Sequence, residues 1–218
     1  MSEVKGVSRR DRAARTRTAI VRAATEEFCR SGYHGATMAS VAKRAGVAVQ
    51  TVYFVFHTKP ALLTAAIDAA VLGDEGPVPP ELTPWWREAT TTGDGRRAVE
   101  LFVANVAEIS TRAAALDQAA QAAVSTDPEV VHVLAHHESL REQGFADYVG
   151  TLAARGLLRE GLDLAEATDV LLTLTGSSVF LDFTEGRGWP VERYVTWTSD
   201  VLATLFLAKP ARGRARPR

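Results

Sequence analysis

Apolar residues recur every three or four positions along most of the chain, the spacing of one face of an α-helix. Six segments follow this spacing, namely residues 12–31, 37–45, 95–124, 127–156, 164–183 and 191–208. Val52–Phe56 departs from it, because all five positions are apolar, as in a buried strand. A lone strand of this length would find no partner, so we predict that Val49–Phe56 is a short helix and that the fold is all-α.

The region around this short helix has the pattern of a helix-turn-helix, at residues 37–56. Thr37 can cap a helix over residues 38–45, and Gly46 suits a sharp turn before the helix Val49–Phe56. Ala42 is small enough to let the two helices cross closely. Thr58 is expected to cap the helix that follows.

Charge is distributed unevenly along the chain. The net charge is −1, yet residues 1–60 hold eleven Lys and Arg against four Asp and Glu, whereas residues 61–208 hold nine against 22. The last ten residues add five basic side chains. A basic end suits a polyanion, although a solvated Arg-rich surface would have the same composition. Because the short helix would also expose aromatic side chains, we favour DNA as the partner.

Composition and motifs exclude several other classes of protein. The single cysteine, Cys29, rules out an intrachain disulfide and a cysteine-based zinc site, and His132 with His136 lacks a third ligand, so we expect no metal. No nucleotide-binding or hydrolase motif occurs, so we expect neither an enzyme nor a cofactor. The start lacks a secretory signal, and the apolar stretch Val170–Phe183 is too short to span a bilayer, so we expect a cytoplasmic protein without membrane contact.

Residues 16–67 resemble the DNA-binding domain of the TetR/AcrR family of bacterial transcriptional regulators. The features that carry the resemblance are FCRSGY at 28–33, VAKRAGV at 41–47, TVYFVF at 51–56 and KPALL at 59–63. The resemblance implies a three-helix DNA-binding domain joined to a larger helical domain for effector binding and dimerisation, with about nine helices in all. We divide the chain into a basic arm (1–11), the DNA-binding domain (12–73), the second domain (74–208) and a basic tail (209–218).

The resemblance also implies roles for single residues at the DNA. Thr37, Tyr53 and Lys59 would contact phosphates, while the groove-facing positions of the short helix are Val49, Gln50, Thr51 and Phe54. Gln50 suits adenine, whereas Val49 and Phe54 could meet thymine methyl groups. Independently of the resemblance, Arg12 and Arg15 at the start of the first helix could reach the minor groove or flanking phosphates, or belong to a disordered, solvated tail. His57 completes the expected contact set. The sequence departs from the family at Ala39, where some members have a base-reading arginine, and at Val55.

The last two helices, within residues 155–176 and 188–207, resemble the dimerising helices of many family members. By this resemblance they form a four-helix bundle between two copies of the chain. We expect the dimer interface to include Leu171, Thr175, Val179, Tyr194, Trp197, Val201 and Leu205.

Polar and aromatic residues on the otherwise apolar middle helices mark a candidate effector pocket. The candidates are Trp85, Phe102, Asn105, Ile109, His137, Tyr148 and Ser178. Family analogy implies an apolar or aromatic effector. The sequence thus predicts a homodimeric repressor that a small effector releases from a palindromic operator. An architectural DNA-binding protein without an effector, or an activator of the same fold, are the alternatives.

Overall fold

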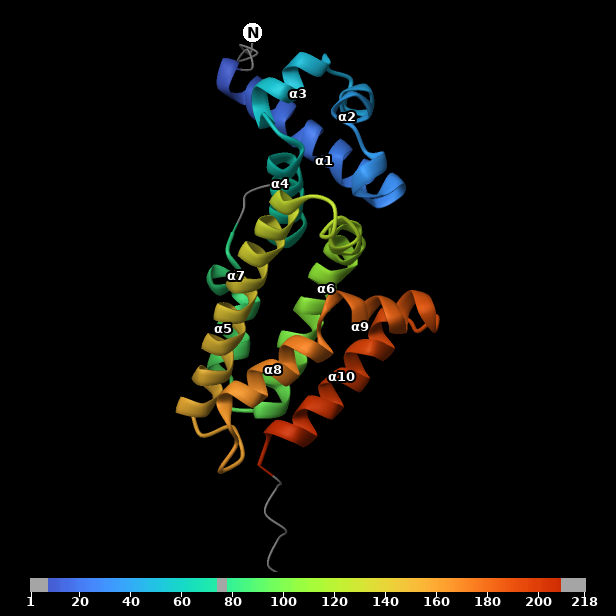
Figure 1. Ribbon diagram of the computed structural model, residues 1–218. Coiled ribbons are helices and arrows are strands. Elements are labelled where there is room, and N and C mark those ends of the chain that lie inside the picture. The colour runs from blue at the N-terminus through green and yellow to red at the C-terminus, as the bar shows by residue number, and fades with distance from the viewer. Residues whose placement is uncertain (1–7, 74–77, 209–218) are drawn as a thin grey trace, which may run out of the picture. The chain divides into compact units, whose positions relative to one another are not determined.

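The computed structural model describes residues 8–73 and 78–208, and within them it contains helices and no strand (Figure 1). The predicted all-α fold is confirmed, with ten α-helices in the described residues where about nine were expected. The helices are α1 (Arg9–Gly35), α2 (Met38–Ala45), α3 (Val49–Phe56), α4 (Lys59–Leu72), α5 (Pro84–Thr91), α6 (Gly95–Gln121), α7 (Pro128–Ala154), α8 (Leu164–Leu174), α9 (Ser177–Leu181) and α10 (Val191–Phe206). A 3₁₀ turn (η1, Pro80–Leu82) precedes α5, and a π-helical turn (η2, Asp182–Gly186) follows α9.

Two compact units share these helices. Unit 1 comprises residues 1–78 and 111–137, and unit 2 comprises residues 79–110 and 138–218. The first unit therefore contains the predicted DNA-binding domain together with the end of α6 and the start of α7. The boundary proposed from the sequence, at residue 73, did not include this second segment.

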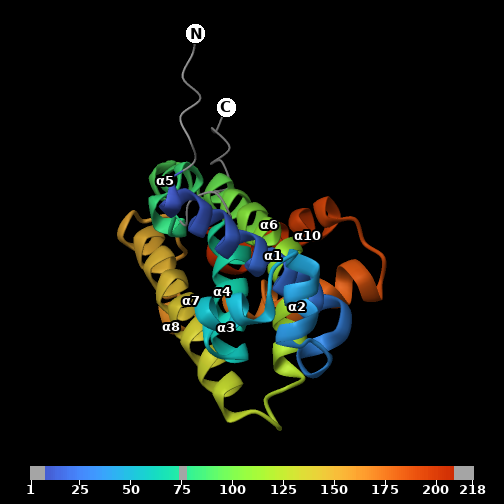
Figure 2. The ribbon, with the colours of Figure 1, turned by 90° about the horizontal axis from the view of Figure 1, so that it is seen from above.

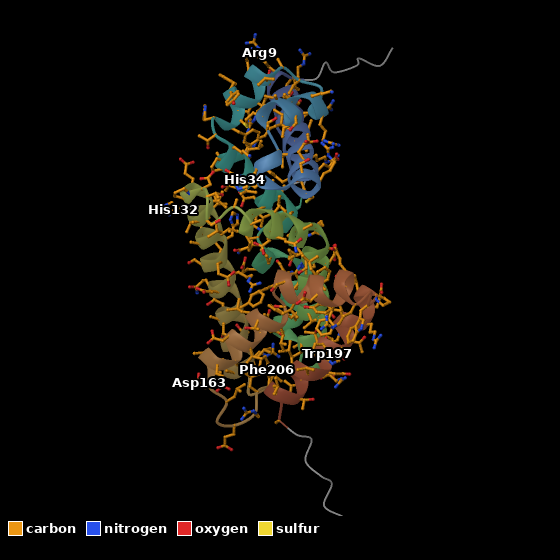
Figure 3. The ribbon with its side chains drawn as sticks, turned by 45° about the vertical axis from the view of Figure 1, so that its right-hand side comes forward. Arg9, His34, His132, Asp163, Trp197 and Phe206 are labelled. Atoms are coloured by element: carbon orange, nitrogen blue, oxygen red, sulfur yellow. The ribbon has the colours of Figure 1, made fainter. Side chains whose placement is uncertain are left out.

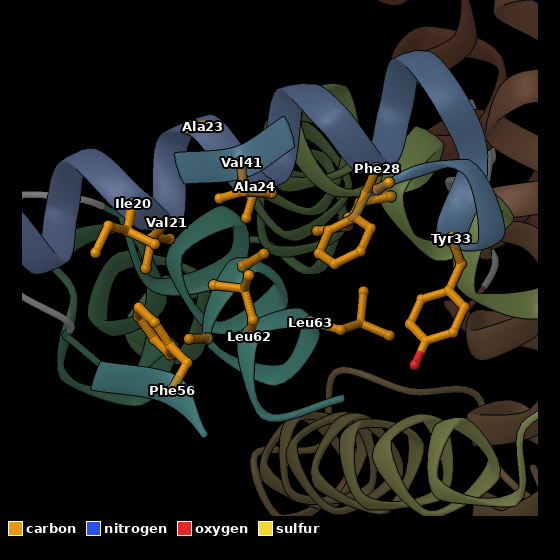
Figure 4. Packing of buried hydrophobic residues seen from close by; sticks show 14 of the residues in the cluster. Ile20, Val21, Ala23, Ala24, Phe28, Tyr33, Val41, Phe56, Leu62 and Leu63 are labelled. Atoms are coloured by element: carbon orange, nitrogen blue, oxygen red, sulfur yellow. The ribbon is translucent and has the colours of Figure 1, made fainter. Parts of the chain in front are cut away.

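The core of unit 1 forms where α1, α2, α3 and α4 converge (Figure 2). In Figure 4 the side chains of Ile20 and Phe28 extend from α1 toward Leu62 and Leu63 of α4. Phe56, the last residue of α3, joins the same cluster and is 3% exposed. Burial of these large side chains fixes the short helix α3 on α1 and α4, because a helix of eight residues is unstable by itself.

The first helix is longer than the sequence suggested. Ser8 caps it, so residues from Arg9 onward are helical, whereas the basic arm was expected to extend to residue 11. Gly32, which was expected to end the helix, has φ 67° and ψ 170° and forms a kink. A further helical turn follows and ends at Gly35. Residues 1–7 and the basic tail at 209–218 lie outside the described residues.

Unit 2 contains a break that the sequence did not predict. The expected helix over 164–183 is interrupted after α8, because Gly176 adopts an extended conformation (φ −69°, ψ 152°). The break frees the carbonyl groups of Leu172 and Leu174, and side chains from other helices satisfy them. The Arg141 guanidinium donates to Leu172 O at 3.0 Å and the Tyr194 hydroxyl to Leu174 O at 2.8 Å.

In the described part of the chain, no single helix is both long and apolar enough to cross a membrane. Two bent pairs of helices reach that length and apolarity only when joined, α3 with α4 and α8 with residues 177–186.

Candidate nucleic-acid interface

The turn between α2 and α3 is defined by local signals. The Thr37 hydroxyl accepts a hydrogen bond from the Ser40 amide at 3.0 Å, and the Ser40 hydroxyl accepts one from the Thr37 amide at 3.0 Å, which together form a capping box. At the other end of α2, Gly46 has φ 68° and ψ 31°, the left-handed conformation that favours glycine. The chain then enters α3 at Val49, as the sequence predicted.

The outer face of α3 consists of Gln50, Tyr53 and Phe54. Tyr53 is 51% exposed and Phe54 is 81% exposed, while Val52 is fully buried. The helical spacing of positions 50, 53 and 54 places the three exposed side chains on one side of α3. They form a contiguous surface on a helix of the type that enters a major groove.

Val49 and Thr51, which were also expected on this face, are half-buried. The side chain of Val49 packs against the core of unit 1. Of the four residues predicted to face the groove, Gln50 and Phe54 are therefore the exposed ones, and Tyr53, predicted to contact a phosphate, is exposed beside them.

A buried carboxylate ties α1 to α2. Glu27 is 2% exposed and accepts hydrogen bonds from Arg44 Nε at 2.6 Å and from Arg30 Nη2 at 2.7 Å. Arg44 also binds Glu26 at 2.7 Å. The hydrogen bond from Arg44, with a further one from Arg30, holds the pKa of Glu27 below its ordinary value against the opposing effect of burial. The sequence did not predict this cluster, although an acid at an apolar position of α1 was a signal.

Helix α1 carries several exposed basic side chains. Arg12 and Arg15 are exposed, as is Arg9 at the start of the helix (Figure 3). The Arg17 guanidinium carbon lies 4.5 Å from the centre of the Phe56 ring, which brings a positive charge from α1 to the end of α3. Residues 8–60 hold ten Lys and Arg against three Asp and Glu, so these helices carry a net positive charge of seven.

The link between α3 and α4 carries two further predicted contacts. His57 is exposed and has φ 57°, the only non-glycine residue with a positive φ in the described chain. Such strained backbone is concentrated at functional sites. Lys59 is half-buried, and its Nζ lies 4.2 Å from the centre of the Tyr33 ring. Burial lowers the pKa of Lys59.

The turn between α6 and α7 is bound to the DNA-binding helices within unit 1. The hydroxyl of the buried Tyr33 donates a hydrogen bond to Asp127 Oδ2 at 2.7 Å. Asp127 also accepts a hydrogen bond from the backbone amide of Glu129 at the start of α7. Three more contacts join the same segments, namely Thr126 Oγ1 to His34 Nε2 at 2.7 Å, Arg112 Nε to Ala70 O at 2.9 Å and His137 Nε2 to Asp68 Oδ1 at 3.0 Å.

Some of the predicted pocket residues come together in unit 2. The rings of Phe102 and Tyr148 are stacked with centroids 4.0 Å apart, and Trp85 lies 6.2 Å from Phe102. Trp86 and Phe145 complete this aromatic cluster. Tyr148 is 2% exposed and its hydroxyl has no hydrogen-bond partner in the described structure, while burial raises its pKa.

The remaining predicted pocket residues do not belong to this aromatic cluster. His137 belongs to unit 1, where its ring binds Asp68 and the Val133 carbonyl. Asn105 donates to Leu101 O within its own helix, Ile109 is half-buried and Ser178 is exposed. Among the described residues, no group of three or more His, Cys, Asp or Glu could hold a metal ion.

The residues predicted for a dimer interface divide into two groups. Leu171, Thr175 and Tyr194 are buried within unit 2, so they are not available to a partner. The other predicted residues are half-buried or exposed on α9 and α10, and they are Val179, Trp197 (Figure 3), Val201 and Leu205.

Comparisons with known proteins agree with this geometry. Residues 20–66 match the family described as bacterial regulatory proteins, tetR family. No curated protein sequence matches the chain.

Similar solved structures cover almost the whole chain. The NalD repressor of the MexAB-OprM multidrug efflux pump in Pseudomonas aeruginosa is 19% identical, with a TM-score of 0.67 and coverage of 89% of this chain and 98% of that chain. The transcriptional regulator FadR from Bacillus subtilis, in complex with stearoyl-CoA, is 17% identical, with a TM-score of 0.64 and coverage of 84% and 96%. A protein from Saccharomonospora viridis in complex with choline is 17% identical, with a TM-score of 0.66 and coverage of 88% and 98%. At these identities the similarity establishes a common fold.

Proposed function

Because residues 20–66 form a domain of the tetR family of bacterial regulatory proteins, we propose that this chain is a sequence-specific DNA-binding regulator of transcription. It acts in the cytoplasm as a homodimer, without catalytic activity or cofactor. The observation that carries the proposal is the exposed face of α3, where Gln50, Tyr53 and Phe54 stand on a buried helix-turn-helix scaffold. Thr37, His57, Lys59, Arg12 and Arg15 are proposed to contact the DNA backbone.

The operator is proposed to be palindromic. Two copies related by a twofold axis present two α3 helices, so the half-sites repeat about 34–36 Å apart or at a multiple of this distance. The exposed apolar side chains of α10, Trp197 and Leu205, support a dimer through this helix.

Regulation is proposed to act by release of DNA. A small apolar or aromatic effector binds in unit 2 beside the aromatic cluster, where the unpaired hydroxyl of Tyr148 supplies a polar anchor. The effector must bind the DNA-incompetent state more tightly than the competent one, because only this difference shifts the equilibrium. Relatives of the same fold bind choline and stearoyl-CoA, which shows the range of ligands that the fold accepts.

Selection of binding sites from random duplex DNA at two salt concentrations tests the DNA-binding part. We expect an enriched palindrome whose affinity falls steeply with salt, by a slope of about −0.9 for each phosphate contact. An absence of enrichment, with weak salt-dependent binding, would support an architectural DNA-binding protein instead.

Release of the selected operator tests the effector part. Stearoyl-CoA, choline and indole as an aromatic probe are titrated against the labelled complex, and fluorescence anisotropy reports dissociation. A compound that releases the operator from the wild type should act more weakly on Tyr148→Phe. In a transcription assay, an activator would raise expression from the operator where a repressor lowers it.

A further inference from the structure

The exposed face of α3 has few means of hydrogen bonding to bases. Phe54 has no hydrogen-bonding group, and Gln50 is the one residue on this face with an amide that can pair with a base in two places. No lysine or arginine occurs between Val49 and Phe56, so the common pairing of a basic side chain with guanine is not available from this helix. The hydrogen-bonding groups on this face are therefore the Gln50 amide and the Tyr53 hydroxyl, and Phe54 can add only an apolar contact.

Phe54 is the residue placed for that contact. Its side chain is 81% exposed, the largest exposed fraction among the large apolar residues of the described chain. An exposed ring gains free energy only when another apolar group covers it. In the major groove the C5 methyl group of thymine is the apolar group on a base edge.

The positive charge of the helices that pack with α3 favours DNA over an apolar protein surface as the cover of Phe54. Arg17 stands at the end of α3 on the Phe56 ring, and the exposed Lys43 lies on α2. Burial of these cations against an apolar partner would be costly, whereas phosphates flanking a major groove would neutralise them.

From these observations, and resting on the proposed DNA-binding function, we propose that Phe54 recognises the C5 methyl group of a thymine in each half-site. Gln50, one helical turn earlier, binds a neighbouring adenine. The half-site therefore contains adjacent A·T pairs, and its affinity depends on a methyl group that forms no hydrogen bond. Val49 takes no part, because its side chain packs on the protein core.

Replacement of each operator thymine by deoxyuridine, one position at a time, tests the proposal. Deoxyuridine keeps every hydrogen-bonding group of thymine and removes only the methyl group. At one position of each half-site we expect the affinity of the wild type to fall by about fourfold, the value of one buried methyl-sized group. Cytosine at that position should bind more weakly than 5-methylcytosine by a similar factor, because the methyl group is the same.

Two variants locate the effect on the protein. Phe54→Ala should bind the thymine and deoxyuridine operators equally, whereas Gln50→Ala should bind more weakly overall but keep the fourfold ratio. Because both side chains are exposed, thermal unfolding of the variants should match the wild type, which excludes a folding defect. A palindrome bound equally in both forms by the wild type would overturn the proposal and leave the DNA-binding function intact. Failure to select any palindrome would overturn the DNA-binding function itself.

Discussion

At the scale of single residues, Glu27 links the stability of the DNA-binding helices to pH. Its pKa in the folded protein lies below the ordinary value of 4.5, chiefly because Arg44 donates a hydrogen bond to it. A lowered pKa stabilises the folded state above about pH 4.5, and this contribution is lost as the pH falls through the folded-state value. We expect Glu27→Gln to lower the melting temperature at pH 7 and the difference from the wild type to shrink below pH 4.5. Glu26→Gln is the control, because Glu26 is exposed and its contact with Arg44 lies at the surface, so its effect should be smaller. Equal effects of the two changes would contradict the role given to Glu27.

Tyr33 is a second residue whose single polar contact can be isolated. Its ring is buried against Phe28, and its hydroxyl binds Asp127 at the start of α7. Tyr33→Phe keeps the ring and removes this hydrogen bond, so we expect a loss of about 1.5 kcal/mol, at the low end for a charged acceptor because Asp127 is half-exposed. Urea unfolding measures the change. Tyr53→Phe, on the exposed face of α3, should leave stability unchanged, and a similar loss in both variants would mean that the bond to Asp127 contributes nothing specific.

At the scale of elements, the turn between α2 and α3 depends on the backbone of Gly46. A Cβ at this position would meet no atom within 4 Å, so the cost of substitution is conformational alone. We expect Gly46→Ala to destabilise the protein by roughly 1–2 kcal/mol, the cost of the left-handed conformation for an L-residue. Gly46→Asn should lose less, because asparagine tolerates this conformation. The control is Gly93→Ala, at a glycine with equally open surroundings and no positive φ, where we expect a change within about 0.5 kcal/mol. Denaturant unfolding distinguishes these outcomes, and a neutral Gly46→Ala would show that the turn can rearrange.

The elements also show which parts of the fold a sequence can predict. The bounds of α3 and the caps at Thr37 and Thr58 were correct, because capping and turn conformation depend on a few neighbouring residues. The break at Gly176 was missed, because its carbonyl groups are satisfied by Arg141 and Tyr194 from distant parts of the chain. For the same reason the burial of Tyr194, which the family resemblance assigned to a dimer interface, could not be foreseen.

At the scale of the whole molecule, the division into two units follows from tertiary packing and not from composition. The sequence placed a domain boundary at residue 73, where glycine and proline accumulate, yet residues 111–137 belong to the DNA-binding unit. Their side chains bind the ends of α1 and α4 through pairs such as Tyr33 with Asp127 and His137 with Asp68. The two pairs are separated by 94 and 69 positions in the sequence, so no local pattern predicts them. Likewise, the sequence did not indicate that His137, an expected pocket residue, packs within unit 1, because helical periodicity gives the face of a helix but not its neighbour.

The proposed dimer gives a prediction that involves both units. Leu205 is 43% exposed on α10 and lies on the surface proposed to meet a second copy. Leu205→Glu would place an unpaired carboxylate in that interface, which costs several kcal/mol when water is removed, so the dissociation constant of the dimer should rise by at least about tenfold. Analytical ultracentrifugation measures the dimer, and binding to a full palindrome should weaken while binding to an isolated half-site stays the same. Leu82→Glu is the matched control, because Leu82 is 69% exposed on the 3₁₀ turn η1 and is outside the proposed interface. If Leu205→Glu leaves the dimer intact, the dimer interface lies on another surface. If the wild type is a monomer that binds half-sites, both the proposed dimer and the proposed palindromic operator are wrong.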